Sequence, residues 1–344
     1  MKKHYHPIDS NVWQGRIDSH EDFDAFRWHQ WIKPIDLLDE TTPPFDGTLG
    51  LCFIGFCCDD GVTRNKGRAG AAKGPRSIRK ELSNLPCQFS SDLKIYDGGN
   101  IYCEDITLEE GQDILASLVK RILDLNLYPV VLGGGHEIAF GHYNGLLNHY
   151  QMLSDSSVVD SHKIGIVNFD AHFDLRPYPN GGSSGTMFRQ IADTCASNDL
   201  HYGYMCLGIQ KRSNTLALFK SARSLGVQYI LAKDMVDQDI WHILERVDSF
   251  IKKHNQIYVT ICADVFSAAF APGVSAAQAV GLHPEQVLKI LKYIILSGKT
   301  VSFDIAEVSP RFDQDNTTSN LAAVLIFALV NTLASLHNLD IAID

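Results

Sequence analysis

Residues 163–174 read Lys-Ile-Gly-Ile-Val-Asn-Phe-Asp-Ala-His-Phe-Asp. The apolar start of this stretch predicts a buried β-strand over residues 163–169, and Asp170, His172 and Asp174 then follow at alternate positions. Alternate residues of an extended segment point the same way, so these three side chains are expected to enter one cleft. Because burying carboxylates without cations is costly, the pattern favours a metal site.

Seven further apolar runs of the same kind occur between residues 49 and 305, and amphipathic stretches separate several of them. The predicted strands are 49–56, 91–96, 128–133, 163–169, 202–209, 227–231, 256–263 and 300–305. The predicted helices include 75–82, 108–125, 214–225, 241–253, 284–297 and 320–336, in which apolar residues recur three and four apart. Strands that are apolar throughout and alternate with helices indicate an α/β fold with a parallel sheet covered on both faces.

The chain of 344 residues is expected to form one such domain over residues 48–344, since no repeat or linker interrupts the pattern. Residues 1–47 are rich in Trp, His, Asp and Pro without a sustained period, which suggests an N-terminal wrapping segment. The tract 151–163 is rich in Ser and Asp and is predicted to be a surface loop.

Composition narrows the possible partners. The formal net charge of −10, without a cluster of Lys and Arg, argues against binding to nucleic acid. We expect no membrane partner, because we find no apolar run of about 18 residues and no basic-then-apolar leader. Eight scattered cysteines without metal-ribbon spacing favour a reducing, cytoplasmic location over a disulfide framework.

Two more predicted strand ends carry potential metal ligands. The strand over 128–133 runs into Gly133-Gly134-Gly135-His136-Glu137, and the strand over 256–263 ends near Cys262 and Asp264. The carboxyl ends of parallel strands form the ligand crevice of such sheets, so six candidate ligands are expected to converge there. They are His136, Asp170, His172, Asp174, Cys262 and Asp264. A set this dense suits two divalent ions with a shared carboxylate, and the expected chemistry is hydrolysis.

Four ordered motifs resemble the ureohydrolase superfamily of arginases and agmatinases: Gly-Gly-Gly-His136-Glu, Asp170-Ala-His-Phe-Asp, the Cys262-Ala-Asp segment leading to Ala271-Pro-Gly, and Ser302-Phe-Asp-Ile-Ala-Glu-Val-Ser-Pro. The resemblance covers about residues 48–336. Further segments, including residues 60–71 and 184–188, are most similar to the formimidoylglutamases within that superfamily. The resemblance implies manganese as cofactor and a three-layer α/β/α fold around an eight-stranded parallel sheet. It also implies hydrolysis of N-formimidoyl-L-glutamate to L-glutamate and formamide, in histidine breakdown, by a metal-activated hydroxide.

That substrate has two carboxylates at one end and a cationic amidine-like group at the other. Arg176 lies two residues past Asp174, where arginases carry a neutral asparagine, and a guanidinium can grip a carboxylate with two hydrogen bonds. Arg64 and Arg68 could add positive charge at the mouth of the site, although a structural salt bridge in their loop is the alternative for both. The resemblance assigns Ser184 to the amino-acid end of the substrate.

The resemblance also implies the catalytic side chains. Glu307 is expected to face the group being hydrolysed, and Asp174 to hold the hydroxide and pass a proton to the departing amine. Phe188 stands where arginases carry a histidine, which counts against arginase activity.

One position departs from the superfamily, because Cys262 stands where an aspartate bridges both metals. A thiolate is a softer ligand and favours zinc or iron over manganese. Three interpretations stay open: Cys262 is a ligand of a two-metal site, it lies outside a site that holds a single ion, or the centre is degraded. Redox coupling of Cys262 to Cys57 or Cys58 is a further hypothesis, with buried inert thiols as its alternative.

Two other functions therefore compete with the first. Another ureohydrolase of the agmatinase or guanidinobutyrase type would carry out related chemistry, and a catalytically silent arginase-fold protein would follow from a degraded centre. The expected partner is a small molecule with two carboxylates, and the chain could form a homo-oligomer.

Overall fold

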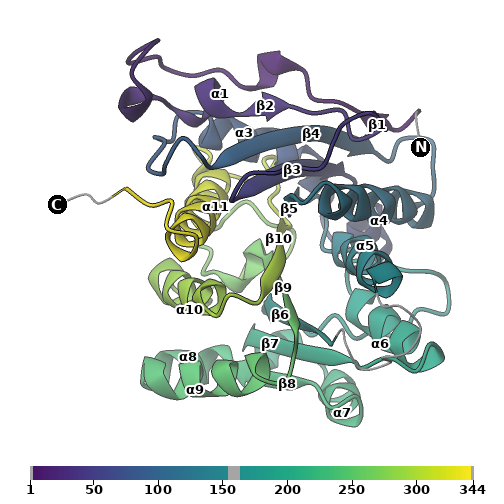
Figure 1. Ribbon diagram of the computed structural model, residues 1–344. Coiled ribbons are helices and arrows are strands. Elements are labelled where there is room, and N and C mark those ends of the chain that lie inside the picture. The colour runs from purple at the N-terminus through teal and green to yellow at the C-terminus, as the bar shows by residue number, and fades with distance from the viewer. Residues whose placement is uncertain (1–2, 154–162, 342–344) are drawn as a thin grey trace.

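The computed structural model describes residues 3–153 and 163–341, and a twisted sheet runs through the middle of this part of the chain (Figure 1). Its eight long strands are all parallel and lie in the order β4-β3-β5-β10-β9-β6-β7-β8. They are β3 (Gly50–Cys57), β4 (Lys94–Tyr102), β5 (Tyr128–Leu132), β6 (Ile164–Phe169), β7 (Gly203–Ile209), β8 (Gln228–Leu231), β9 (Gln256–Cys262) and β10 (Thr300–Ala306). All eight predicted strands are present.

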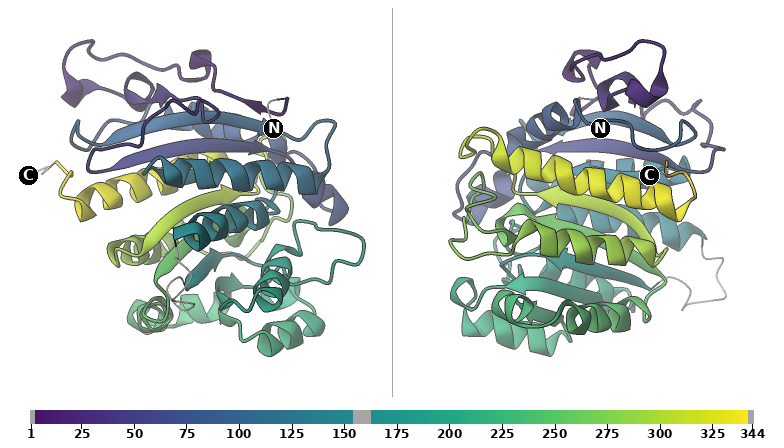
Figure 2. Two further views of the ribbon diagram at one scale, coloured as in Figure 1. Left: turned by 45° about the vertical axis from the view of Figure 1, so that its right-hand side comes forward. Right: turned by 90° about the vertical axis from the view of Figure 1, so that its left-hand side faces the viewer.

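The sheet is larger than the expected eight strands, because the N-terminal segment adds two short ones. β1 (Tyr5–His6) pairs antiparallel to β4, and β2 (Lys33–Pro34) pairs parallel to β4. Figure 2 shows this purple segment lying along the β4 edge of the sheet. The segment also contributes the fully buried Trp28 to the core. Its pairing covers part of the backbone edge that β4 would otherwise expose.

Helices cover both faces of the sheet, as the alternation of strands and helices predicts (Figures 1 and 2). On one face lie α3 (Gly74–Leu82), α8 (Ala232–Asp237), α9 (Ile240–Ile251), α10 (Pro284–Leu296) and α11 (Thr317–Leu336). On the other lie α4 (Leu108–Asp124), α5 (Ile138–Leu153), α6 (Met187–Ser197) and α7 (Leu216–Ser224). The shorter elements are η1 (Ser10–Val12), η2 (Phe23–Ala25), α1 (Trp28–Trp31), α2 (Asp60–Arg64), η3 (Ala71–Lys73), η4 (Lys211–Ser213) and η5 (Ala263–Val265). The two apolar cores lie between the sheet and each helical layer, which gives the three-layer α/β/α architecture.

The predicted loop over residues 151–163 begins too early. Helix α5 continues to Leu153, and the rest of that prediction falls mostly on residues 154–162, which lie outside the described part of the chain.

Strand β4 continues to Tyr102 rather than ending at residue 96. The turn-like residues that follow Tyr96 include Asp97, whose buried carboxylate is matched by the buried guanidinium of Arg79 at 2.7 and 2.9 Å. The indole of Trp13 donates a further hydrogen bond of 2.8 Å to the same carboxylate. Because these donors satisfy the buried charge, the strand can continue through a residue that usually ends one.

The prediction that the chain has no apolar run of about 18 residues is wrong at helix α11. This helix is uncharged over 20 residues and apolar enough to cross a membrane, so an apolar run longer than expected does exist. It packs against α3 and α10, and 56% of its most apolar window is buried inside the protein. We therefore interpret α11 as a helix of one outer layer whose apolar side chains pack into the core beneath it.

Candidate metal centre and substrate cavity

The candidate ligands follow β5, β9 and β6, and Glu307 follows β10, which lies between β5 and β9 in the sheet. His136 follows β5, Glu307 follows β10, and Asp170 follows β6. Cys262 is the last residue of β9, and Asp264 lies in the 3-10 turn η5 directly after it. Parallel strands end on the same edge of a sheet, so this topology brings together groups that are far apart in sequence.

The run from Asp170 to Asp174 does not extend the strand as predicted. β6 ends at Phe169, and the chain then bends, with Asp174 in the left-handed region at φ 51°. The bend is held in part by the carboxylate of Asp170, which accepts a hydrogen bond of 2.7 Å from the backbone N–H of His172. The three side chains still reach one site, but a folded turn rather than strand alternation brings them there.

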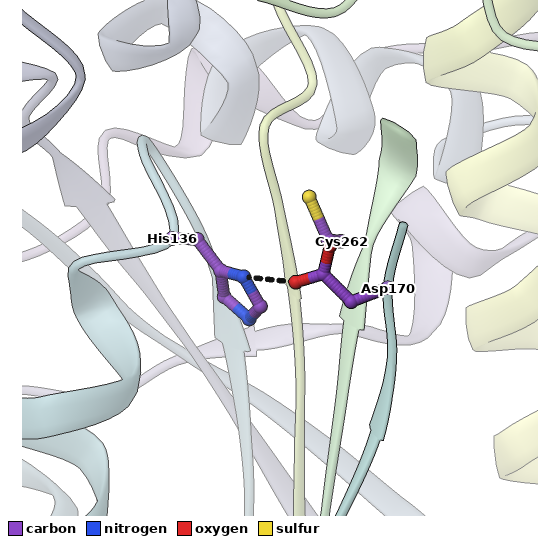
Figure 3. Close-up of side chains that lie close together, drawn as sticks. All are labelled: His136, Asp170 and Cys262. Atoms are coloured by element: carbon purple, nitrogen blue, oxygen red, sulfur yellow. Dashed lines mark ion pairs between the residues drawn. The ribbon is translucent and has the colours of Figure 1, made fainter. Parts of the chain in front are cut away.

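Two groups of potential ligands overlap at Asp170. One group is His136, Asp170 and Cys262, and the other is Asp170, His172 and Asp264; within each, the ligand atoms lie within 4.8 Å of one another. Figure 3 shows the first group converging at the ends of the strands, with the His136 ring facing the carboxylate of Asp170. A carboxylate shared between two groups of ligands matches the expected arrangement for two ions.

The potential ligand atoms lie close together, but several of them make no hydrogen bond of good geometry. His136 Nδ1 lies 3.0 Å from Asp170 Oδ2 and 3.2 Å from Asp174 Oδ2, yet it makes no hydrogen bond of good geometry. His172 Nδ1 lies 3.1 Å from Asp264 Oδ2, while the other carboxylate oxygen of Asp264 has no partner among the described residues. Unsatisfied buried ligand atoms around a common point fit a divalent cation, which would satisfy them together.

The pKa shifts of these side chains also favour a bound cation. Burial raises the pKa of Asp174 to about 6, with repulsion from Asp170 adding to the effect. Burial alone would lower the pKa of His136, but Asp170 and Asp174 more than offset this and raise it well above its usual value. Burial also raises the pKa of the Cys262 thiol well above its usual value. A cation would compensate the negative charge that burial disfavours at Asp174 and Cys262, and at His136 it would replace the proton that the two carboxylates attract.

A cavity of about 290 Å³ opens above this centre. Its walls combine the ligands with polar and cationic side chains from five loops. The lining residues are Asn65, Lys66, Gly67, Arg68, His136, His172, Asp174, Arg176, Ser184, Ser213, Cys262, Asp264, Ser275, Ala276 and Glu307. A larger surface hollow of about 500 Å³ is lined by α10 and α11, and Asp340 is its one acidic residue among those described. The smaller cavity is therefore the one in which potential metal ligands border a space large enough for a small substrate.

Glu307 is held in the wall of the cavity by two hydrogen bonds. Its Oε1 accepts from the backbone N–H of His136 at 3.2 Å, and its Oε2 accepts from the hydroxyl of Ser275 at 2.5 Å. Burial raises the pKa of Glu307 to about 7, and repulsion from Asp264 adds to this.

Arg176 and Ser184 both line the cavity, as the sequence predicts. Their loops are joined by a hydrogen bond of 3.0 Å from the Arg176 N–H to the Gly185 carbonyl. The Arg176 side chain is exposed to the cavity mouth, with no hydrogen bond or ion pair to any described residue. Its guanidinium is therefore available to a ligand.

The other two arginines are engaged elsewhere. Arg64 forms an ion pair of 2.6 Å with Glu109, donates 3.1 Å to the carbonyl of Gly182, and does not line the cavity. Arg68 lines the cavity, but it donates to the backbone carbonyls of Ser275 and Val274 at 3.0 and 2.7 Å. The alternative of a structural salt bridge describes Arg64, whereas Arg68 is held by backbone carbonyls instead, and neither guanidinium is proposed as a substrate ligand.

Lys66 is a cavity residue that the sequence analysis missed. It is exposed, lines the cavity and has a left-handed backbone with φ 63°. Left-handed backbone is uncommon for lysine, and it turns this side chain toward the site while Arg64 points away. The neighbouring Gly67 was the available signal, since a glycine after a charged loop residue suggests a tight turn.

The neighbouring cysteines lie away from Cys262. The Cys57 thiol lies 3.7 Å from the Asn100 side chain, and the Cys58 thiol lies beside that of Cys103, which raises its pKa. Neither is among the described residues that line the cavity. The structure gives no support to redox coupling between them and Cys262.

Comparison with known proteins agrees with this geometry. A model of the arginase family matches residues 50–331. The chain belongs to the arginase family. Among its arginase-family relatives, the formimidoylglutamase of Clostridium tetani is 57% identical over 98% of this chain and 98% of that protein. The formimidoylglutamase of Geobacillus thermodenitrificans is 43% identical over 93% of this chain and 94% of its own length.

Solved arginase-family structures share the fold. The formimidoylglutamase of Bacillus subtilis superposes with a TM-score of 0.77 at 20% identity, over 93% of this chain and 96% of that one. The formiminoglutamase of Trypanosoma cruzi with Mn²⁺ superposes with a TM-score of 0.73 at 23% identity, over 88% and 99%. The expected arginase-like fold is confirmed.

Proposed function

We propose that the protein hydrolyses N-formimidoyl-L-glutamate to L-glutamate and formamide at the centre described above. The observation that carries the proposal is the lining of the cavity, which combines carboxylates and potential metal ligands with Lys66 and Arg176, two cations that pair with none of the described residues. Such a cavity matches a substrate with a cationic formimidoyl group and two carboxylates. The 57% identity to a formimidoylglutamase supports the same reaction.

We propose that His136, Asp170, His172, Asp174, Cys262 and Asp264 would together hold two divalent ions. Manganese is the expected ion, with zinc or iron as alternatives because of the Cys262 thiol. Bound ions would act as Lewis acids and lower the pKa of a coordinated water.

The side chains of this chain would orient the substrate. Arg176 would bind one carboxylate with two N–H donors, and the Lys66 ammonium would bind the other. Ser184 lines the same cavity and would donate a hydrogen bond from its hydroxyl to the amino-acid end of the substrate. Glu307 would hold the formimidoyl group through a charge-assisted hydrogen bond to its N–H groups, because Ser275 and the His136 N–H fix its carboxylate in the cavity wall.

The reaction breaks the bond between the formimidoyl carbon and the glutamate nitrogen, and that nitrogen must gain a proton as it leaves. Asp174 lies in the cavity wall beside His136, so its carboxylate is within reach of the reacting groups and would accept a proton and pass it to the leaving nitrogen. We therefore assign proton transfer to Asp174.

The competing functions fit less well. Agmatine is a dication, and the cations of Lys66 and Arg176 would repel it at the cavity mouth. A degraded centre is disfavoured because Cys262 lies within ligand range of His136 and Asp170.

Turnover assays decide between these functions. The protein prepared with reductant and Mn²⁺ is incubated separately with formimidoylglutamate, agmatine, guanidinobutyrate and arginine, while glutamate, formamide and urea are measured. We expect glutamate and formamide from the first substrate alone. Urea from arginine or agmatine, without turnover of formimidoylglutamate, would overturn the proposal.

The role of Arg176 has its own test. Arg176→Met should raise KM for formimidoylglutamate by about 10-fold to 100-fold, the equivalent of one lost charge-assisted bond, with a smaller effect on kcat. Arg189→Met is the matched control, because Arg189 pairs with Asp193 on α6 and does not line the cavity. Equal KM values for the two variants would remove Arg176 from the substrate site.

A further inference from the structure

A chain of buried polar groups lies beneath the candidate metal centre. The Nε2 atom of His136 lies 3.0 Å from the hydroxyl of Thr260, and that hydroxyl donates a hydrogen bond of 2.5 Å to Asp304. All three side chains are buried, with exposed fractions of 1%, 0% and 0%. None of the roles assigned above to ligands or substrate contacts uses Thr260 or Asp304.

The sheet register places these groups together. Thr260 and Asp304 are direct partners across the parallel strands β9 and β10. Thr260 also precedes Cys262 by two residues, so both side chains point to the same face of β9. His136 reaches the same place from the end of β5, the other neighbour of β10. The hydrogen-bonded chain is thus one layer of side chains below the ligands.

Asp304 accepts from other donors as well. The hydroxyl of Tyr258 donates to its Oδ2, and the Nδ1 atom of His142 lies 2.6 Å from the same oxygen. With donors converging on Asp304 from three side chains, the carboxylate is the acceptor for each of them.

This arrangement determines where the protons lie. A hydroxyl has one proton to donate, and Thr260 donates it to Asp304. Thr260 can then only accept from His136, so Nε2 must carry a proton. The other ring nitrogen, Nδ1, is the atom that lies 3.0 Å from Asp170 and faces the ligand group. With Nε2 protonated, Nδ1 is the nitrogen whose lone pair is available to a cation.

We infer that Asp304 and Thr260 are positioning residues that hold the His136 imidazole in its Nε2-protonated form and fix its orientation for metal binding. Mutation of a residue that hydrogen-bonds to the far side of a metal ligand typically weakens metal binding by about 10-fold to 100-fold. The inference rests on the proposed metal centre but not on the proposed substrate. Metal binding, rather than turnover, therefore tests it.

The test compares variants that differ by one hydroxyl. Thr260→Val removes the hydroxyl with little change in shape, Thr260→Ser keeps it, and Tyr258→Phe removes a different hydroxyl that also donates to Asp304 but does not touch His136. The dissociation constant for Mn²⁺ is measured from the electron paramagnetic resonance signal of the free ion. We expect an increase of about 10-fold to 100-fold for Thr260→Val, and changes within about threefold for the other two variants.

A second measurement needs no variant. In protein labelled with ¹⁵N-histidine and loaded with Zn²⁺, the His136 resonances should show the proton on Nε2. A proton on Nδ1, or a Thr260→Val protein that binds Mn²⁺ within about threefold of Thr260→Ser, would overturn the inference. A wild-type protein that binds neither ion would instead refute the metal centre itself. Thermal unfolding of each metal-free variant checks that it folds.

Discussion

Cys262 is the candidate metal ligand at which this chain departs from the superfamily pattern. It is buried within ligand range of His136 and Asp170, although the superfamily pattern predicts an aspartate at this position. Because burial raises the pKa of the thiol, the metal-free protein holds it protonated, and binding of an ion would release that proton. Of the three interpretations that the sequence left open, the geometry favours Cys262 as a ligand.

A Co²⁺-substituted protein tests this assignment. A thiolate bound to Co²⁺ gives a charge-transfer absorption band in the near ultraviolet, and we expect this band in the wild type. Cys262→Ser should remove it, while Cys58→Ser should keep it because Cys58 contacts Cys103 outside the cavity. Persistence of the band in Cys262→Ser would place the thiolate ligand elsewhere.

Backbone strain also concentrates at this site. Lys66, Asp174 and Glu307 all have left-handed backbones, with φ of 63°, 51° and 66°, and all three line the cavity. Such conformations cost free energy for residues with a side chain and persist where the surrounding contacts hold them. They turn the chain sharply after each strand or loop, which aims the side chains inward.

At the scale of elements, α5 shows where pattern and packing disagree. This helix is absent from the predicted helices, and its interior contains Gly141 and Gly145, a residue type that disfavours helix. In the structure both glycines face α4, where an added Cβ would lie 2.7 Å from the Gln112 carbonyl and 2.8 Å from the Ala116 carbonyl. The glycines therefore permit a close approach of two helices.

Gly141→Ala should destabilise the protein, although alanine is the better helix former by about 1 kcal/mol in isolation. The new methyl group would press on backbone rather than on a flexible side chain, and overpacking of this kind costs about 1–3 kcal/mol. Urea unfolding of the metal-free protein measures the change. Asn148→Ala, on an exposed position of the same helix, should be neutral or slightly stabilising. A more stable Gly141→Ala protein would contradict the packing argument.

At the scale of the whole molecule, the cluster of ligands makes stability depend on pH and metal together. The pKa values of Asp174 and Glu307 are raised to about 6 and about 7 in the folded protein, whereas both carboxyls ionise near pH 4 in an unfolded chain. Between these limits the folded state holds more protons, so stability falls as pH rises. Burial opposes protonation of His172, but Asp264 and Asp170 outweigh it and raise its pKa, which acts in the same direction at higher pH.

We therefore expect the metal-free protein to unfold at a lower temperature at about pH 8 than at about pH 5.5. Saturating Mn²⁺ should reverse the trend, because the metal competes with protons for the same groups. Thermal unfolding with a chelator and with Mn²⁺ measures both slopes. Glu307→Gln should flatten the metal-free slope. A metal-free protein that becomes more stable over this range would show that other groups dominate.

The sequence by itself determined the architecture and pointed to the candidate ligands. Apolar runs such as residues 164–169 have no stable alternative to burial, and the histidine and aspartate motifs after them are informative because such groups are rarely buried without a cation. β4 and α5 were less predictable, because their turn-like Asp97 and Gly141 are accommodated by distant partners, Arg79 and α4.

Only the tertiary structure decided which charges face the cavity. Arg64, Lys66 and Arg68 lie close together in the sequence, at the end of α2 and just after it, and nothing in the sequence distinguishes the three cations. The fold pairs Arg64 with Glu109, commits Arg68 to backbone carbonyls and leaves Lys66 open to the cavity. The direction of a side chain depends on backbone dihedrals and on partners far away in the sequence, and local sequence records neither. The contacts from His136 through Thr260 to Asp304 could not be predicted for the same reason. They form only because β5, β10 and β9 lie side by side in the sheet.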